Sequence, residues 1–589
     1  MRGRIWIAGA CALAAAVPVA IESPAAGAAM PTPLKQPTAT GRGGGAATMS
    51  PYATQAAIDV LKDGGNAVDA AVAAAATLGV TEPFVAGPGG GGFFVYRRAS
   101  DRKVFTIDGR EKAPAGARPD MFLDAGGKPE DFETAVESGK SIGVPGQVAT
   151  WAVALQHFGT RTLKRVFKPA EAVARQGFPL DQALVSAIAA NKSKLAHFPA
   201  AAGLYLPGGQ VPPVGYVLRN PDLAHTYARI GRHGWRWFYT GPIAKELANL
   251  VQHPSNSPGT GPVQPGTMTA GDMRNYTAPL RKPVTWKYRG YRLWGMAPPT
   301  SGGTTIGEAM NILENFDQGG DRTQALYRYM EASKLAYADR NQYVGDPDHV
   351  GVPIHGILSQ AYANDRAKLI GPTAAPAPVA SGNPWAYDGA GDPGANYRVA
   401  GGGVEQHTNH LVVADRWGNV VSYTNTIEQI AGSGMLLPNR GFLLNNELTD
   451  FNFPTGTANS VAPTKRPRSS MSPTIITRNG KLFEAVGSPG GATIITTVLQ
   501  TVLDQLDFGM SLPQAIQSPR VSQANSAKAT AEQGFIDRYG AGLSALGEQF
   551  TSTNYIGIAA GLRYLPRGRL QTASERWRGG GGSAMVVKP

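Results

Sequence analysis

Two β-prone segments separated by four turn-forming residues constrain the fold of this chain most. The segments are residues 411–415 and 420–426, and Arg-Trp-Gly-Asn at 416–419 lies between them. This pattern predicts an antiparallel hairpin. Opposed residue numbers in a hairpin have a constant sum, here about 834 or 835, so we expect Thr408 to face the neighbourhood of Thr426.

Thr408 would open the first strand, directly after a tract rich in Pro, Ala, Gly and Ser at about 371–404. Such a composition buries little apolar surface and is typical of a flexible linker. If the peptide bond before Thr408 were cut, the new α-amino group, with a reference pKa of about 7.7 to 8.0, would take the proton of the hydroxyl on the same residue. A threonine at a strand start is also common without catalysis, so this hypothesis needs support from elsewhere in the chain.

The N-terminus has the three parts of a secretory signal. Arg2 and Arg4 precede an apolar run at 5–21 and the small residues Ala-Gly-Ala at 26–28. We expect removal of residues 1–28 and export to a periplasm or the extracellular space, with a retained membrane anchor as the alternative. Cys11, the only cysteine, lies in this segment, so the mature protein would have no disulfide, cysteine nucleophile or cysteine-ligated zinc.

The formal net charge is +13. Such an excess suits nucleic acid or another anionic partner, but the charges are scattered along the sequence and the densest cluster, 465–468, is short. We interpret the excess as a basic solvated surface that helps to gather anionic substrates, and we expect no nucleic-acid partner. The nine histidines are dispersed and no HExxH motif occurs, so the sequence predicts no metal site.

Glycines in the N-terminal part stand at the predicted ends of helices and strands. A helix is predicted over 51–62, ended by glycines at 64–65, and Asn66 is placed to cap a second, alanine-rich helix over 67–78. The run at 87–92 fits GxGxxG, but it follows a helix and precedes a strand, which is the reverse of a dinucleotide-binding fold. We expect this run to let two backbones, or a backbone and a substrate, approach closely.

Two further features suit chemistry on a carbonyl compound. Arg110 follows a predicted strand at 104–108, where a guanidinium fork would match a carboxylate, although such an arginine is often only a surface ion-pair partner. The loop at 487–491 precedes a predicted helix at 492–506. Amides at a helix N-terminus stabilise an oxyanion, whereas a plain strand-to-helix turn would look the same in sequence.

Taken together, these segments resemble the γ-glutamyltransferase (γ-glutamyltranspeptidase, glutathione hydrolase) family of N-terminal-nucleophile hydrolases, over nearly the whole mature chain. The segments that carry the resemblance are GGNAVDAA at 64–71, the glycines at 87–92, GRE at 109–111, GVPG at 143–146, ADR at 338–340, TNH at 408–410, LLNN at 443–446, KRP at 465–467, SSMSPT at 469–474 and GSPGG at 487–491.

The resemblance implies an α/β fold, a four-layer αββα sandwich, and a precursor that cuts itself between His407 and Thr408. The products would be a large subunit, 29–407, and a small catalytic subunit, 408–589, that form one unit. The resemblance implies no cofactor and no membrane contact after signal removal. It also implies transfer of the γ-glutamyl group of glutathione and similar amides to water, amino acids or peptides.

The resemblance also implies the roles of individual residues. Thr408 would be the nucleophile and Thr426 would bond its amine or hydroxyl, while the backbone amides of Gly490 and Gly491 would hold the oxyanion. The donor's α-carboxylate would be held by Arg110, Ser469 and Ser470, and its α-ammonium by Glu428, Glu447 and Asp450.

Two alternatives stay open: a cephalosporin or glutaryl acylase of the same fold, and an uncleaved, inactive binding protein that is secreted. A glutaryl group has no α-ammonium to match the acidic residues. The chain also departs from the family pattern twice. Asn409 stands where the family has Thr or Ser, and the segment between Asp450 and Lys465 is short, which favours an open cleft that admits larger γ-glutamyl compounds, including poly-γ-glutamate.

Overall fold

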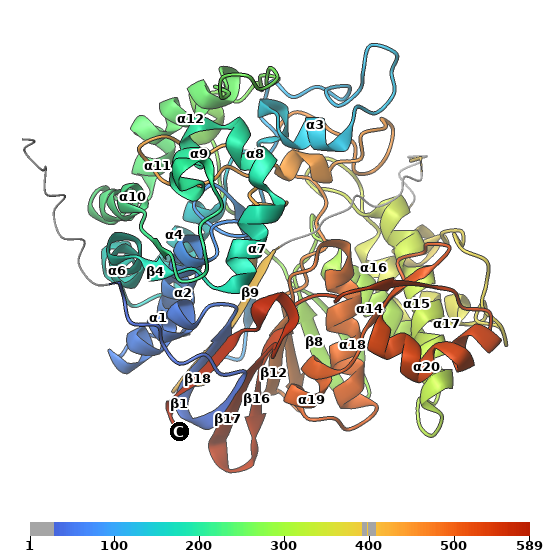
Figure 1. Cartoon of the computed structure of the whole chain (residues 1–589). Coiled ribbons are helices and arrows are strands. Elements are labelled where there is room, and N and C mark those ends of the chain that lie inside the picture. Colours follow the sequence, from blue (N-terminus) through green and yellow to red (C-terminus); the bar gives the residue numbers. More distant parts are fainter. Residues whose placement is uncertain (1–28, 392–396, 399–407) are drawn as a thin grey trace, which may run out of the picture.

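The computed structural model describes residues 29–391, 397–398 and 408–589 (Figure 1). The predicted signal segment 1–28 and His407, which precedes the expected cleavage point, lie outside the described residues. Within the described part, no helix is both long and apolar enough to cross a membrane.

An antiparallel β-structure forms the centre of the molecule. Its main sheet has 13 strands in the order β6-β3-β2-β10-β9-β1-β17-β16-β12-β11-β8-β7, and β18 also pairs with β1. Strand β1 joins two layers of this sheet. The strands of the layer that contains β9 are β2 (Gly91–Arg97), β3 (Val104–Gly109), β6 (Leu280–Arg281), β9 (Asn409–Asp415), β10 (Val420–Thr426) and β18 (Ser583–Lys588). The strands of the layer that contains β17 are β7 (Val284–Tyr288), β8 (Tyr291–Gly295), β11 (Thr474–Arg478), β12 (Lys481–Gly487), β16 (Ala560–Leu565) and β17 (Arg569–Ser574).

Strand β1 (Thr38–Thr48) passes from one layer of the sheet to the other. Its first residues pair with β17, and its second half pairs with β9 and β18, with a shift in register between Arg42 and Gly45. Gly43 and Gly44 have φ of 80° and 111° at this shift. Glycine adopts these angles without steric cost. The sheet therefore folds over, so that β9 and β10 face β12 and β16.

Helices cover both outer faces, so the predicted four-layer αββα sandwich is confirmed. Helices α2 and α4 pack on β9, β10, β2 and β3, whereas α14, α18 and α19 pack on β7, β8, β12, β16 and β17. Figure 1 shows the N-terminal helices, blue to green, on one side of the strands and α14 to α20 on the other. The helices of the first side are α1 (Pro51–Lys62), α2 (Ala67–Thr81), α3 (Phe132–Val136), α4 (Gln147–Phe158), α5 (Leu163–Val166), α6 (Lys168–Gln176), α7 (Gln182–Ala190), α8 (Lys192–His197), α9 (Pro199–Tyr205), α10 (Pro221–His233), α11 (Arg236–Thr240), α12 (Pro242–Gln252) and α13 (Ala270–Arg274).

The remaining elements complete the second side and two small sheets. The helices are α14 (Gly302–Leu313), α15 (Arg322–Tyr343), α16 (Ile354–Ile357), α17 (Gln360–Ala367), α18 (Ile494–Leu506), α19 (Leu512–Gln517) and α20 (Gln533–Ala545). The short strands are β4 (Phe178–Pro179), β5 (Val217–Leu218), β13 (Val521–Ser522), β14 (Ala529–Glu532) and β15 (Phe550–Thr553).

The local predictions for the first two helices are confirmed. Helix α1 spans 51–62 as expected, and Asn66 caps α2 by accepting from the amides of Val68 and Asp69. Helix α2 continues to Thr81, three residues beyond the prediction, and every residue in it is buried. Its small alanine side chains let the helix lie close to β9 and β10, the strands that carry the hairpin.

Two segments differ from the sequence-based interpretation. The described part of the Pro- and Ala-rich tract, 371–391, is attached to the domain by hydrogen bonds such as Gly382 N to Asp339 Oδ1, 2.7 Å, and Val379 N to Asn525 Oδ1, 2.7 Å. The basic cluster 465–468 is buried, not solvated. Its Lys465 donates to two carbonyls, and burial lowers the pKa of this amine to about 8.

Candidate functional site

Thr408 lies beside Thr426 at the open end of the β9–β10 hairpin. Asn409 pairs with Asn425 and Val420 with Ala414, so opposed numbers sum to 834, as predicted. The next pair in this register is Thr408 with Thr426, and their hydroxyl oxygens are 3.4 Å apart. Thr408 is 6% exposed. The expectation that two hydroxyls meet at one end of the hairpin is confirmed.

The glycine run 87–92 brings neighbouring backbone against this end. A Cβ at Gly90 would lie 1.9 Å from the carbonyl oxygen of Thr426, and one at Gly89 would lie 2.1 Å from that of Leu443. No other residue type fits at such distances. The prediction that these glycines permit close approach of two backbones is confirmed.

A small cavity of about 10 Å³ opens at Thr408. Seven of the residues predicted as site residues line it, together with Met471, which the sequence did not single out. The seven are Arg110, Thr408, Thr426, Glu428, Glu447, Asp450 and Ser469. One cation therefore faces three carboxylates around the threonine hydroxyl.

The Arg110 guanidinium contacts the acidic residues directly. It follows β3 and is 1% exposed, and its two terminal nitrogens form ion pairs with Glu447 and Asp450. Both acids lie on one 3-10 turn, Glu447–Asp450. The guanidinium also donates to the carbonyls of Pro467 and Arg468, each at 3.1 Å. The groups expected to bind the two ends of an amino acid are thus paired with one another.

Glu428 is held in an uncommon backbone conformation next to Thr426. Its φ is 77°, in the left-handed region that only glycine visits freely, and its amide donates to the Thr426 hydroxyl at 2.9 Å. The side-chain amide of Asn446 donates to the Glu428 carboxylate. Sequence reasoning did not assign Asn446 a place in the site, although it precedes Glu447 directly.

Ser470 does not line the cavity, in contrast to Ser469. Its hydroxyl accepts from Arg340 at 2.7 Å, and the same guanidinium donates to Ser301 at 2.8 Å. The backbone carbonyl of Ser469 accepts from the amide and the hydroxyl of Ser301, at 2.8 and 2.7 Å. Arg340 and Ser301 thus hold Ser469 and Ser470 in position through hydrogen bonds, and neither Arg340 nor Ser301 lines the cavity.

Gly490 and Gly491 precede α18 as predicted, but neither lines the cavity. They have φ of 135° and 58°, and Gly491 begins a 3-10 turn that leads into the helix. Amides at such a position have no acceptor within the helix. Their assignment to an oxyanion site stays a prediction.

His410 lies between this loop and strand β10. Its Nδ1 lies 2.8 Å from the Thr424 hydroxyl, and a Cβ at Gly487, where the loop begins, would lie 2.3 Å from the imidazole. Burial lowers the pKa of His410 to about 3, so the ring is neutral near pH 7. A neutral ring with such a low pKa is a poor general base.

Asn409 points away from the cavity side of β9. It is fully buried, and neither its side-chain atoms nor those of Asn425 opposite have a hydrogen-bond partner among the described residues. The described residues contain no group of three or more His, Cys, Asp or Glu arranged to hold a metal ion.

Comparisons with known proteins agree with this geometry. A family model described as Gamma-glutamyltranspeptidase matches residues 53–585. The chain is 41% identical over 516 residues to a glutathione hydrolase proenzyme of Bacillus subtilis (strain 168), covering 87% of this chain and 86% of that one. It is 35% identical over 493 residues to an Acylase ACY 1 proenzyme of Pseudomonas sp. (strain V22), covering 82% and 83%. The crystal structure of a cephalosporin acylase from Bacillus halodurans superposes with a TM-score of 0.81 at 25% identity, covering 97% of this chain and 100% of that one.

Proposed function

The chain belongs to the gamma-glutamyltranspeptidase family of enzymes, and from this premise we propose that it is a γ-glutamyltransferase and glutathione hydrolase with Thr408 as its nucleophile. The proposed precursor cleaves itself between His407 and Thr408. This gives a large subunit, 29–407, and a small subunit, 408–589. They remain one folded unit because β1 of the first pairs with β9, β17 and β18 of the second, and β2 of the first pairs with β10.

The observation that carries the proposal is the position of Thr408. Its hydroxyl lies on the wall of a cavity, 3.4 Å from the hydroxyl of Thr426, which in turn accepts the amide of Glu428. His410, the nearest imidazole along the strand, is buried and neutral. An α-amino group on Thr408 itself, created by cleavage, would supply a base with a pKa near 8 at the right place.

The proposed reaction proceeds in two steps. The Thr408 oxygen attacks the γ-carbonyl carbon while its proton passes to the Thr408 amine, and the oxyanion that forms is stabilised by the amides of Gly490 and Gly491. The carbon–nitrogen bond breaks, and the leaving amine takes the proton. Water or an acceptor amine then attacks the ester on Thr408, which releases glutamate or a new γ-glutamyl amide and restores the hydroxyl.

The proposed binding of the donor's amino-acid end follows from the charges. Three carboxylates, Glu428, Glu447 and Asp450, against the single Arg110 favour an α-ammonium group, because a buried cation needs opposite charge nearby. The α-carboxylate would lie against Arg110 and Ser469, where the guanidinium fork matches it, and Ser470, which does not line the cavity, would support Ser469 as its neighbour. Arg110 is already bound by Glu447 and Asp450, so the donor carboxylate joins or displaces these contacts.

A second candidate, a glutaryl or cephalosporin acylase, is supported by the similarity to the Pseudomonas acylase proenzyme and to the Bacillus halodurans structure. The same charges disfavour it. A glutaryl group would bring its carboxylate into a cavity that already holds three carboxylates, with no ammonium to offset them.

Two 4-nitroanilides that differ only in the α-amino group distinguish the candidates. We expect the purified protein to release nitroaniline from γ-glutamyl 4-nitroanilide much faster than from glutaryl 4-nitroanilide, and to form γ-glutamyl dipeptide when glycylglycine is added. Preference for the glutaryl compound would assign the chain to the acylases, and no release from either would refute catalysis.

We also propose export through the signal at 1–28.

A further inference from the structure

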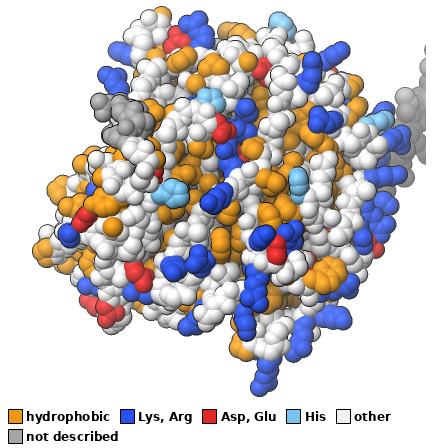
Figure 2. Space-filling model, turned by 180° about the vertical axis from the view of Figure 1, so that it is seen from behind, with side chains coloured by type: hydrophobic (Ala, Val, Ile, Leu, Met, Phe, Trp, Pro, Cys, Tyr) orange, Lys and Arg blue, Asp and Glu red, His pale blue; other side chains and the backbone are white. Residues whose placement is uncertain are grey.

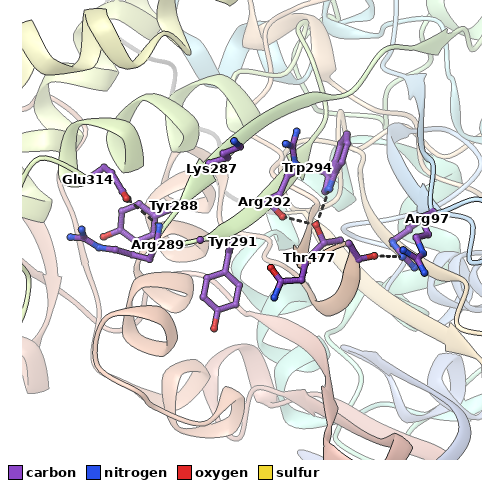
Figure 3. A pocket seen from close by; sticks show the side chains of 13 residues that line it. Arg97, Lys287, Tyr288, Arg289, Tyr291, Arg292, Trp294, Glu314 and Thr477 are labelled. Carbon is purple, nitrogen blue, oxygen red and sulfur yellow. Dashed lines mark hydrogen bonds between the residues drawn. The ribbon is translucent and has the colours of Figure 1, made fainter.

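A wide groove of about 570 Å³ lies between three hairpin turns. The turns join β7 to β8, β11 to β12, and β2 to β3. In Figure 3 the side chains extend from Arg289 and Glu314 at the left, through Arg292 and Trp294, to Arg97 at the right. The groove is far larger than the cavity at Thr408, with about 570 Å³ against about 10 Å³.

The groove is separate from the catalytic cavity. Strand β2 connects the two: Gly91 pairs with Thr426 at one end of the strand, and Arg97 lines the groove at the other. Its seven residues, Gly91–Arg97, span about 20 Å at about 3.3 Å per residue. No residue lines both spaces.

The groove concentrates positive charge. Five cationic side chains line it, against the single carboxylate of Glu314. Within the described part of the chain, Arg102, Lys287 and Arg292 have no carboxylate within ion-pair distance, in contrast to Arg289, which is 3.5 Å from Asp507. The other lining cation is Arg97.

Arg97 shows that the positive charge is poorly compensated. It is 5% exposed, and its Nε has no hydrogen-bond partner among the described residues, although its terminal nitrogen donates to the carbonyl of Gly480 at 3.1 Å. Burial and the neighbouring Arg102 lower the pKa of Arg97. Removing a guanidinium from water without an anionic partner costs free energy, and a bound anion would reduce that cost.

The aromatic rings of the groove are already covered by arginines of the chain itself. Arg292 lies 5.8 Å from the ring centre of Trp294, and Arg289 lies 5.1 Å from that of Tyr288. Arg478 similarly covers Tyr291 at 5.0 Å. Single-stranded nucleic acids bind largely by stacking bases on open rings, so this arrangement disfavours them. The concave shape likewise disfavours a flat membrane surface.

We propose that this groove is a binding site for a flexible polyanion, a chain that carries repeated carboxylate or phosphate groups. Arginine forks bind either group in a bidentate manner, and an extended chain would place successive anions along the line from Arg289 to Arg97. The proposal is independent of the proposed activity. If the polymer carries γ-linked glutamates, the groove would also hold a polymeric donor near the enzyme.

The test compares two triple variants of the full chain. R102S/K287S/R292S removes three cations from the groove. The control R229S/R232S/K245S removes two arginines and one lysine from exposed positions on α10 and α12, so both variants have the same net charge. Binding of fluorescently labelled polyglutamate and of polyphosphate is measured by anisotropy at about 50 and 200 mM salt.

We expect the groove variant to bind about tenfold more weakly than wild type, and the control to bind as wild type does. Binding of polyglutamate alone would identify carboxylates as the ligand, and binding of polyphosphate alone would identify phosphates. Equal weakening in both variants, or no binding by wild type, would overturn the proposal. The rate on γ-glutamyl 4-nitroanilide, measured in parallel, reports the proposed activity separately.

Discussion

The cavity at Thr408 and the cationic groove lie at opposite ends of strand β2, and they differ in how their charges are balanced. At Thr408 the charged groups are almost fully buried, and Arg110 forms ion pairs with Glu447 and Asp450. In the groove, Arg102, Lys287 and Arg292 are exposed and have no acidic partner among the described residues. Figure 2 shows Lys and Arg side chains spread widely over one face of the molecule, with few acidic ones between them.

This difference indicates two kinds of recognition. A buried, compensated cluster distinguishes small ligands through exact positions, because each unpaired charge inside it is strongly unfavourable. An open, uncompensated cluster attracts any suitably spaced anions and depends on salt. Four predictions test this distinction, beginning with the largest expected effect.

Replacing Thr408 by Ala should abolish activity in the cavity and leave the groove unchanged. We expect a loss on the order of 10³-fold or more in the release of nitroaniline, because the nucleophilic oxygen is gone. Thr408→Ser, which keeps a hydroxyl and an amine, should retain measurable activity. Polyanion binding by Thr408→Ala should equal that of wild type; full activity of this variant would refute the assignment of the nucleophile.

Replacing Asp450 by Ala should destabilise the folded protein by about 3 kcal/mol, because it removes one partner of the buried Arg110 pair. The matched control is Asp348→Ala, since Asp348 also pairs with an arginine, Arg281, but its side chain is 50% exposed. We expect the control to lose about 1 kcal/mol or less in urea unfolding. Equal losses in the free energy of unfolding would show that the ion pairs of the cavity stabilise the fold no more than exposed ion pairs do.

The buried His410 should make the cavity end sensitive to acid. Its pKa is about 3 in the folded chain and near 6.5 when unfolded, so the unfolded state binds more protons and stability falls as pH drops from 6.5 towards 3. Between pH 7 and 5.5 wild type should lose about 1 kcal/mol more than His410→Gln. The two unfolding free energies are compared at each pH, and parallel curves would contradict a neutral buried ring.

The smallest effect is expected for the groove variant on small substrates. R102S/K287S/R292S should change kcat/KM for γ-glutamyl 4-nitroanilide by no more than about twofold. These exposed side chains line the groove at the far end of β2, about 20 Å along that strand from the residue that pairs with Thr426. A large loss in kcat/KM would show that the two ends of the sandwich are coupled.

Much of the structure around Thr408 was predictable because its signals are local. The hairpin register follows from strand length and turn length alone, so Thr408 and Thr426 could be paired in advance. The capping of α2 by Asn66 depends on only four residues. The direct contact of Arg110 with Glu447 and Asp450 was not predictable, because it depends on how a 3-10 turn more than 300 residues away packs on β3.

The cationic groove was missed for the same reason. Its cations come from two hairpins that are far apart in sequence, and only the folded sheet brings Arg97, Lys287 and Arg292 together. Conversely, the densest basic segment in the sequence, 465–468, is buried, where Arg466 pairs with Asp108 and Asp348. Charge density along a chain therefore did not predict charge density on its surface.

The measurement that tests the central claim most directly is the mass of the purified protein under denaturing conditions, with N-terminal sequencing of every species. We predict two chains, the smaller beginning Thr408-Asn409-His410, and a single uncut chain for Thr408→Ala. A wild-type protein that remains one chain after prolonged incubation would contradict an N-terminal threonine nucleophile and favour an uncleaved binding protein.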